Sequence, residues 1–125
     1  MSLKSKKEEA RALAELAVKG IQEKKGLEII WLDLKNISNA VTDYFIICHG
    51  TSNTHVDSLA DSVEDEVRLG AGEKPWHKEG VENAEWVLLD FVDVVVHIFQ
   101  REAREFYKLE ELWADAERIE LVNEF

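Results

Sequence analysis

The chain has 125 residues, 46% of them hydrophobic and 33% charged, which predicts one compact domain (1–125) with a real core. Its 26 acidic and 15 basic residues give a formal net charge of −11. Because Lys and Arg supply the affinity for phosphate, this charge argues against direct nucleic-acid binding and favours a basic partner. The lone Cys48 excludes an intramolecular disulfide. With no signal-peptide pattern and no membrane-length apolar run, we expect a cytoplasmic protein that does not contact membranes.

The charge is unevenly distributed along the chain. Residues 1–25 hold seven bases and four acids, whereas residues 43–93 hold twelve acids and three bases. Two interpretations stay open: a solvated acidic surface, or one acidic face that docks on a cationic protein.

The first half of the chain predicts one helix and two strands. Ser5 and Glu8 have the spacing of a capping box, and apolar residues at steps of three and four then predict a helix over about 6–24. Residues 27–34 are rich in β-formers and predict a strand. The unbroken apolar run 44–48 is typical of a strand covered on both faces, so we expect it in the centre of the sheet.

The second half begins with a helix and a loop. Thr51 or Ser52 is the expected N-cap of the helix, and Gly70 is its expected end. The segment 71–83 contains two glycines and the only proline, and it predicts the longest loop.

Two strands with a short link follow at 85–90 and 93–99, and a final helix begins near Arg101. We expect the ends of the chain, 1–5 and 118–125, to fray. The order α-β-β-α-β-β-α predicts an α/β fold of the α+β type, a mixed sheet with flanking helices. The strand–helix–strand unit from Phe45 to Val87 should be a right-handed crossover between parallel strands.

The hairpin formed by 85–90 and 93–99 is the most informative feature. If Phe91 and Val92 are its two turn residues, Asp90 lies opposite Asp93, and the strand residues divide between two faces. The aliphatic face is expected in the core and carries Val87, Leu89, Val94, Val96 and Ile98. The other face carries Trp86, Leu88, Asp90, Asp93, Val95 and His97.

Two interpretations of this second face are open. A tryptophan beside acids has the composition of a binding hot spot, and an incoming cation would relieve the repulsion between Asp90 and Asp93. Alternatively, the final helix covers the face, Trp86 joins a second core and a neighbour satisfies His97. A different turn length would also change the pairing.

The pattern predicts no catalytic residue, metal or cofactor. A two-metal site for nucleotidyl transfer needs carboxylates that project together along one strand, whereas Asp90 and Asp93 span a turn. The four histidines have no close ligand spacing, and Cys48 has no second cysteine. Cys48 is expected to be a core thiol, because the adjacent His49 points to the opposite face.

Several blocks, taken together, carry a family resemblance. They are 43–52 followed by His55, then Glu79-Gly80, 86–90 and 93–99, with Arg104, Tyr107, Leu109-Glu110 and Leu112-Trp113 after them. In this order and spacing they resemble the Iojap-like ribosomal silencing factors, over residues 7–117. Thr54 and Val92 depart from the family pattern, which usually has arginine and glycine at these positions.

The resemblance implies a factor that binds protein fourteen of the large ribosomal subunit at the intersubunit face. There it would block the small subunit from joining and repress translation when nutrients are scarce. It also implies a nucleotidyltransferase-like fold without known catalytic activity. The expected partner-binding residues are Trp86, Leu88, Asp90, Asp93, His97 and Glu79. A homodimer stays open, and the alternative function is a nucleotide-binding or nucleotidyltransferase enzyme on the same fold.

Overall fold

The computed structural model describes residues 5–121, so the expectations for 1–4 and 122–125 lie outside it. Within that range the chain forms four helices and six strands. They are α1 (Lys6–Glu23), β1 (Leu27–Asp33), β2 (Tyr44–Gly50), α2 (Asn53–Ala71), β3 (His77–Glu79), β4 (Trp86–Asp90), β5 (Val94–Gln100), α3 (Arg101–Tyr107), α4 (Leu109–Leu112) and β6 (Glu117–Glu120). The side chains of Ser5 and Ser52 cap the first two helices, as the sequence predicts.

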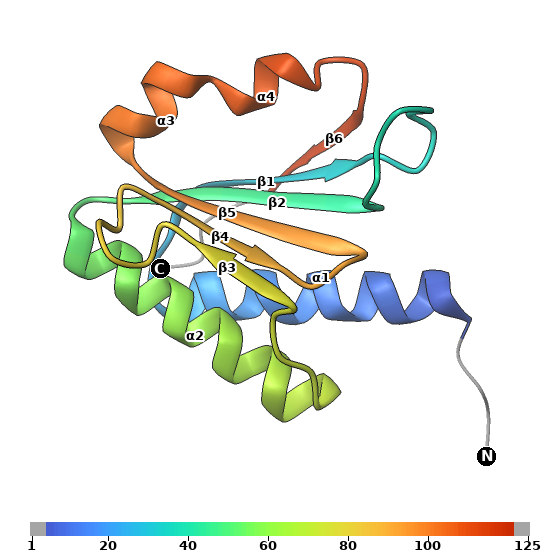
Figure 1. The fold of residues 1–125 in the computed structure, drawn as a ribbon, viewed down its shortest axis with the longest axis horizontal. Helices are drawn as coiled ribbons and strands as arrows, with labels where there is room; N and C mark the ends of the chain where they lie inside the picture. Colours follow the sequence, from blue (N-terminus) through green and yellow to red (C-terminus); the bar gives the residue numbers. More distant parts are fainter. Residues whose placement is uncertain (1–4, 122–125) are drawn as a thin grey trace.

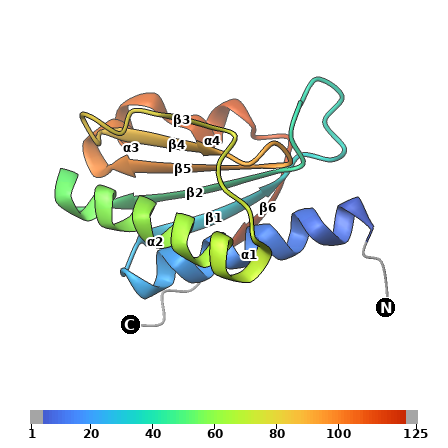
Figure 2. The same ribbon diagram turned by 60° about the horizontal axis from the view of Figure 1, so that its bottom comes forward.

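The strands form one mixed sheet in the order β3-β4-β5-β2-β1-β6. Only β2 and β5 pair in parallel, and β2 lies inside the sheet as expected. Helices α1 and α2 cover one face of the sheet, and α3 and α4 lie over the other (Figures 1 and 2). The predicted α+β class with flanking helices is therefore confirmed.

The crossover prediction is wrong in its partner strand. We expected the strand after α2 to be parallel to β2, but β4 lies outside β5 and runs antiparallel to it, and β5 is the parallel neighbour of β2. The burial of the two strands explains the exchange. All residues of β5 except the last are buried, whereas β4 alternates between buried and half-buried residues, which suits a more peripheral position.

Three further elements extend the expected order. Strand β3 lies in the segment predicted to be a loop, and the final helix is broken into α3 and α4 at Lys108, whose φ is +50°. Strand β6 pairs with β1 where fraying was expected for residues 118–120, because it covers backbone groups at an otherwise open edge. Helix α2 ends at Ala71, with Gly72 at a left-handed φ of +69°, rather than at Gly70.

The register of the β4–β5 hairpin differs from the prediction by two residues. Asp90 pairs with Val95 and not with Asp93, which belongs to the three-residue loop 91–93. In this loop Val92 adopts a φ of +78°, and its N–H donates to the Asp90 carboxylate at 2.7 Å. A shift by two preserves the faces, so the predicted aliphatic core face is confirmed, and all five of its residues are buried.

Helices α1 and α2 approach closely over this core face. At Gly20 an added Cβ would lie 2.8 Å from the backbone of Ser62 and Val63, and the Ser62 hydroxyl donates to the Gly20 carbonyl at 2.8 Å. Cys48 is fully buried in this core, as predicted, and burial raises the pKa of its thiol to about 12.

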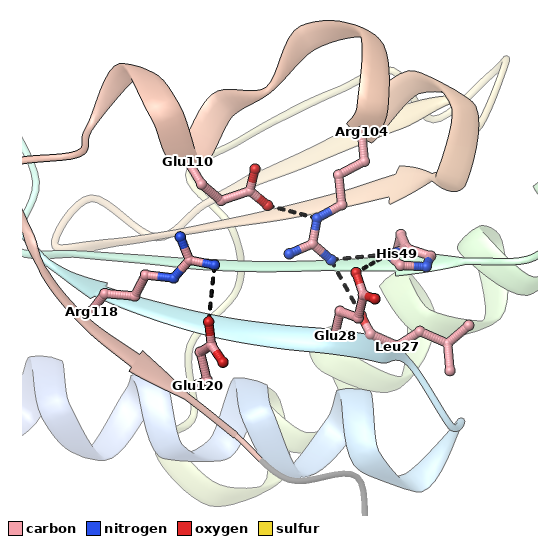
Figure 3. A network of polar contacts seen from close by, with 7 residues as sticks. All are labelled: Leu27, Glu28, His49, Arg104, Glu110, Arg118 and Glu120. Carbon is pink, nitrogen blue, oxygen red and sulfur yellow. Dashed lines mark hydrogen bonds and ion pairs between the residues drawn. The ribbon is translucent and has the colours of Figure 1, made fainter.

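A buried arginine fixes α3 and α4 to the sheet (Figure 3). The Arg104 Nε donates to Glu110 at 2.6 Å, and its Nη1 lies 2.9 Å from Nδ1 of His49 and 3.4 Å from the carbonyl oxygen of Leu27. Arg104 is only 7% exposed. Burial and then the Arg104 charge lower the pKa of His49, so this contact uses a neutral imidazole.

Candidate partner-binding site

A pocket of about 290 Å³ lies on the sheet face that carries α3 and α4. Strands β3, β4 and β5 form one side of it, and the loop 34–42 and Trp113 form the other. Its apolar walls come from Leu34, Phe45, Leu88, Val95 and Trp113, and its polar groups come from Thr42, Glu79, Asp90 and His97. The pocket therefore brings together four of the six predicted site residues: Glu79, Leu88, Asp90 and His97.

Trp86 lies beside this pocket and does not line it. Its ring stacks on Phe99 with centroids 4.8 Å apart and lies 4.9 Å from the ring of Tyr107 on α3. The indole N–H donates to Nδ1 of His97 at 3.1 Å. Both features match the alternative interpretation, in which Trp86 packs on a second core and a neighbour satisfies His97. Trp86 is half-buried, so part of its ring also stays exposed at the surface.

His97 is held as a neutral ring under the pocket. It is 4% exposed, and burial lowers its pKa to about 3. The Phe45 ring meets it edge-on, with centroids 4.6 Å apart. His97 can therefore act as a neutral hydrogen-bonding group at ordinary pH, and not as a cation.

The predicted acids take different positions. Asp90 lines the pocket while its carboxylate caps the loop at Val92, and exposed Glu79 lines it from β3 and pairs with His77 at 3.3 Å. Asp93 does not line the pocket. Its side chain is exposed, and its carbonyl oxygen accepts from the N–H groups of Asp43 and Tyr44. Two of the three predicted acids, Asp90 and Glu79, thus lie at the pocket rim, and Asp93 lies on the neighbouring loop.

Gly80 allows Glu79 to reach the rim. Its φ is +76°, and an added Cβ would clash with the carbonyl oxygen of Trp86. No other residue fits this turn, which folds β3 back along β4.

Sequence reasoning missed the contribution of the loop 34–42 and of Trp113. The buried Thr42 carries no motif, and the loop is polar in composition. Its position depends on the hydrogen bond from the N–H of Asp43 to the carbonyl oxygen of Asp93, a contact across the fold. The one available signal was the apolar pair Ile37 and Ala40 inside a polar stretch.

The pocket has the properties of a binding site for another molecule: apolar walls, few polar groups and an acidic rim. Within residues 5–121, no three His, Cys, Asp or Glu side chains gather closely enough to hold a metal ion. Over the same residues, no helix combines the length and apolar character needed to cross a membrane.

Comparison with known proteins finds one family. A family model described as "Ribosomal silencing factor during starvation" matches residues 7–124. The ribosomal silencing factor RsfS of Halalkalibacterium halodurans is 41% identical over 109 residues, which cover 87% of this chain and 92% of that protein. The protein of the same name from Bacillus subtilis is 38% identical over 111 residues, covering 89% and 92%.

Solved structures agree with this match. The crystal structure of a Chromobacterium violaceum protein superimposes with a TM-score of 0.78 at 34% identity, covering 83% of this chain and 85% of that one. A Bacillus halodurans crystal structure gives a TM-score of 0.76 at 38% identity, covering 89% and 99%. A mouse protein named "Mitochondrial assembly of ribosomal large subunit protein 1" is 38% identical over 74 residues, 58% of this chain and 32% of its own length.

Proposed function

Because the chain belongs to the family of ribosomal silencing factors during starvation, we propose that it binds the large ribosomal subunit and blocks the small subunit from joining. The contact is protein fourteen of the large subunit, at the intersubunit face. The consequence is lower translation under nutrient limitation. The protein acts in the cytoplasm as a binding factor and not as an enzyme.

The observation that carries this proposal is the family match over residues 7–124, almost the whole chain. The relatives that cover most of the chain are themselves named ribosomal silencing factors. The mouse relative is named for the assembly of the large ribosomal subunit, which supports this subunit as the partner. The nucleotidyltransferase-like kinship and the homodimer stay predictions.

We place the contact surface at the pocket, its acidic rim and the adjoining face of the hairpin, with Trp86, Leu88, Asp90, Asp93, His97 and Glu79 as the partner-binding residues. The net charge of −11 supports a basic protein partner, since complementary charges speed and orient association. Leu88 is half-buried in the pocket wall, and the rim acids lie beside it. An apolar anchor inside a charged rim is the usual anatomy of a protein–protein contact.

The test is the joining of purified subunits followed by sedimentation. Wild-type protein should lower the yield of complete ribosomes and sediment with the large subunit alone. Leu88→Gln should weaken both effects, whereas the matched variant Leu69→Gln should not. Leu69 is 73% exposed on α2, over the opposite face of the sheet. Unchanged subunit joining at saturating wild-type protein would contradict the proposed function.

A further inference from the structure

Two buried polar atoms at the pocket have no hydrogen-bond partner among residues 5–121. They are Nε2 of His97 and Oγ1 of Thr42, each with less than 1 Å² exposed. Both residues line the same pocket, from β5 and from the loop 34–42. Leaving a buried polar group without a hydrogen bond costs about 1–3 kcal/mol. The presence of two such atoms at one pocket therefore points to a ligand that bonds them.

The hydrogen bond from Trp86 fixes the chemistry of His97. The indole N–H can only donate, so Nδ1 of His97 must accept and carries no proton. In a neutral imidazole the proton then lies on Nε2, which makes this atom a donor. Nε2 is then the ring nitrogen of His97 that has no partner within residues 5–121, and His97 lines the pocket.

Thr42 adds a second hydrogen-bonding group. Its hydroxyl can rotate and donate alongside Nε2–H. A ligand that satisfies both atoms therefore supplies hydrogen-bond acceptors, which the carbonyl oxygens of a peptide provide. A lysine or arginine head has donors only and would leave Nε2–H of His97 unpaired.

The rest of the pocket decides between neutral and charged acceptors. Glu79 and Asp90 at the rim disfavour a carboxylate or phosphate inside it. The walls of Leu34, Phe45, Leu88, Val95 and Trp113 favour an apolar group beside the acceptor. The same rim acids favour a positively charged residue just outside the pocket.

We propose that the pocket receives an apolar side chain from a basic segment of protein fourteen, and that backbone carbonyl oxygens of that segment accept from Nε2–H of His97 and from the Thr42 hydroxyl. This inference rests on the proposed function and adds the chemistry of the group that is recognised. Thr42 and His97 then determine specificity, while Leu88 and Phe45 supply apolar contact.

The experiment measures affinity for purified protein fourteen and for isolated large subunits with three proteins: wild type, Thr42→Val and Thr42→Ser. Valine keeps the shape of threonine and removes the hydroxyl, and serine is the matched control that keeps it. Thr42→Val should bind at least tenfold more weakly, and Thr42→Ser should stay within about threefold of wild type. Removing an unpaired hydroxyl leaves nothing behind to desolvate, so the melting temperature of Thr42→Val should not fall.

A second readout needs no substitution. In protein labelled with ¹⁵N at histidine, the NMR spectrum should show His97 as the Nε2–H tautomer, and the Nε2–H proton should shift and exchange more slowly when protein fourteen is added. An Nδ1–H tautomer, or an Nε2–H signal that ignores the partner, would overturn the inference even if Thr42→Val failed to fold.

The outcomes separate the inference from the function on which it rests. If wild-type protein binds neither probe, the proposed function fails, and the partner named here fails with it. If wild type binds and Thr42→Val binds equally well, the Thr42 hydroxyl takes no part in the contact, so the inference fails while the function stands. If Thr42→Val and Thr42→Ser weaken binding equally, the shape of the pocket and not the hydroxyl determines the affinity. That result would also overturn the inference.

Discussion

Arg104 on α3 and His49 on β2 lie 2.9 Å apart, joined by a guanidinium donor and an imidazole acceptor in the protein interior. The same guanidinium binds Glu110 on α4, with side chains only 8% and 13% exposed. One arginine therefore links both short helices to the sheet that carries the candidate site.

Replacing this arginine should be costly. Arg104→Met leaves a nearly buried carboxylate without its cation, and we expect the free energy of unfolding to fall by about 3–5 kcal/mol. Arg118→Met is the control, because its ion pair with Glu120 is 46% and 73% exposed and should contribute less than about 1 kcal/mol. Urea denaturation of both variants measures the difference. If both variants lose a similar free energy of unfolding, burial does not determine how much the Arg104–Glu110 pair contributes to stability.

Stability should fall as the pH falls below about 6.5. Burial lowers the pKa of His97 to about 3 in the folded protein, from the ordinary histidine value of 6.5, so between these values only the unfolded chain binds the proton. One such group contributes up to about 1.4 kcal/mol per pH unit. Denaturation midpoints from pH 4 to pH 7 for wild type and His97→Gln should differ in slope, with the steeper dependence in wild type. Equal slopes would mean that His97 titrates normally.

Val92→Gly should stabilise the protein. Val92 is 56% exposed and holds a φ of +78°, which a β-branched residue adopts only with strain. Relief of such strain contributes about 1–3 kcal/mol, reduced by the greater entropy of glycine in the unfolded chain. Thermal melting should therefore rise. Val41→Gly, at a residue that is 97% exposed, is the control, and it should not gain stability.

Trp86 should contribute to stability as well as to binding. Because its ring stacks on Phe99 and its N–H bonds His97, Trp86→Ala should lower the free energy of unfolding by about 2–4 kcal/mol. Trp86→Phe keeps an aromatic ring and loses the N–H donor, so its free energy of unfolding should fall less. Melting and affinity for large subunits are measured on the same preparations. If Trp86→Ala melts like wild type and binds tenfold more weakly, Trp86 contributes to partner binding and not to stability.

Binding to the large subunit should weaken with salt. The Debye length shortens from about 10 Å at 0.1 M to about 3 Å at 1 M, so attraction between the acidic rim and a basic partner is screened. Glu79→Gln should slow association at low salt and have little effect at high salt, because Glu79 is exposed at the rim. Glu15→Gln, on an exposed face of α1, serves as the control. Association rates that ignore salt would assign recognition to apolar contacts.

Local patterns in the sequence predicted local structure well. The caps at Ser5 and Ser52 depend on neighbours three residues away, and the face of each hairpin residue depends only on alternation. For that reason the prediction of the aliphatic face is confirmed, although the predicted pairing of Asp90 with Asp93 is wrong. The register depended on a valine at positive φ, which propensity disfavours and which the Asp90 cap supports.

The candidate site was predicted only on its strand side. Leu88, Asp90 and His97 share a face by alternation, and Glu79 was added by the resemblance. Thr42 and Trp113 reach the pocket through contacts between distant parts of the chain. No local pattern places a loop before β2 beside a helix that follows β5, so the two unpaired atoms could be found only in three dimensions.

The pairing of β1 with β6 has a consequence for how the protein is made. Strand β1 begins at Leu27, yet its outer neighbour begins only at Glu117, and the N–H of Leu121 bonds the carbonyl oxygen of Ile29. During synthesis, the outer edge of β1 therefore stays uncovered until some ninety later residues have been made. Until then, its row of unpaired backbone groups can recruit a strand from another nascent chain. Protein truncated before Glu117 should accordingly form aggregates, even though helices α1 and α2 are complete in it.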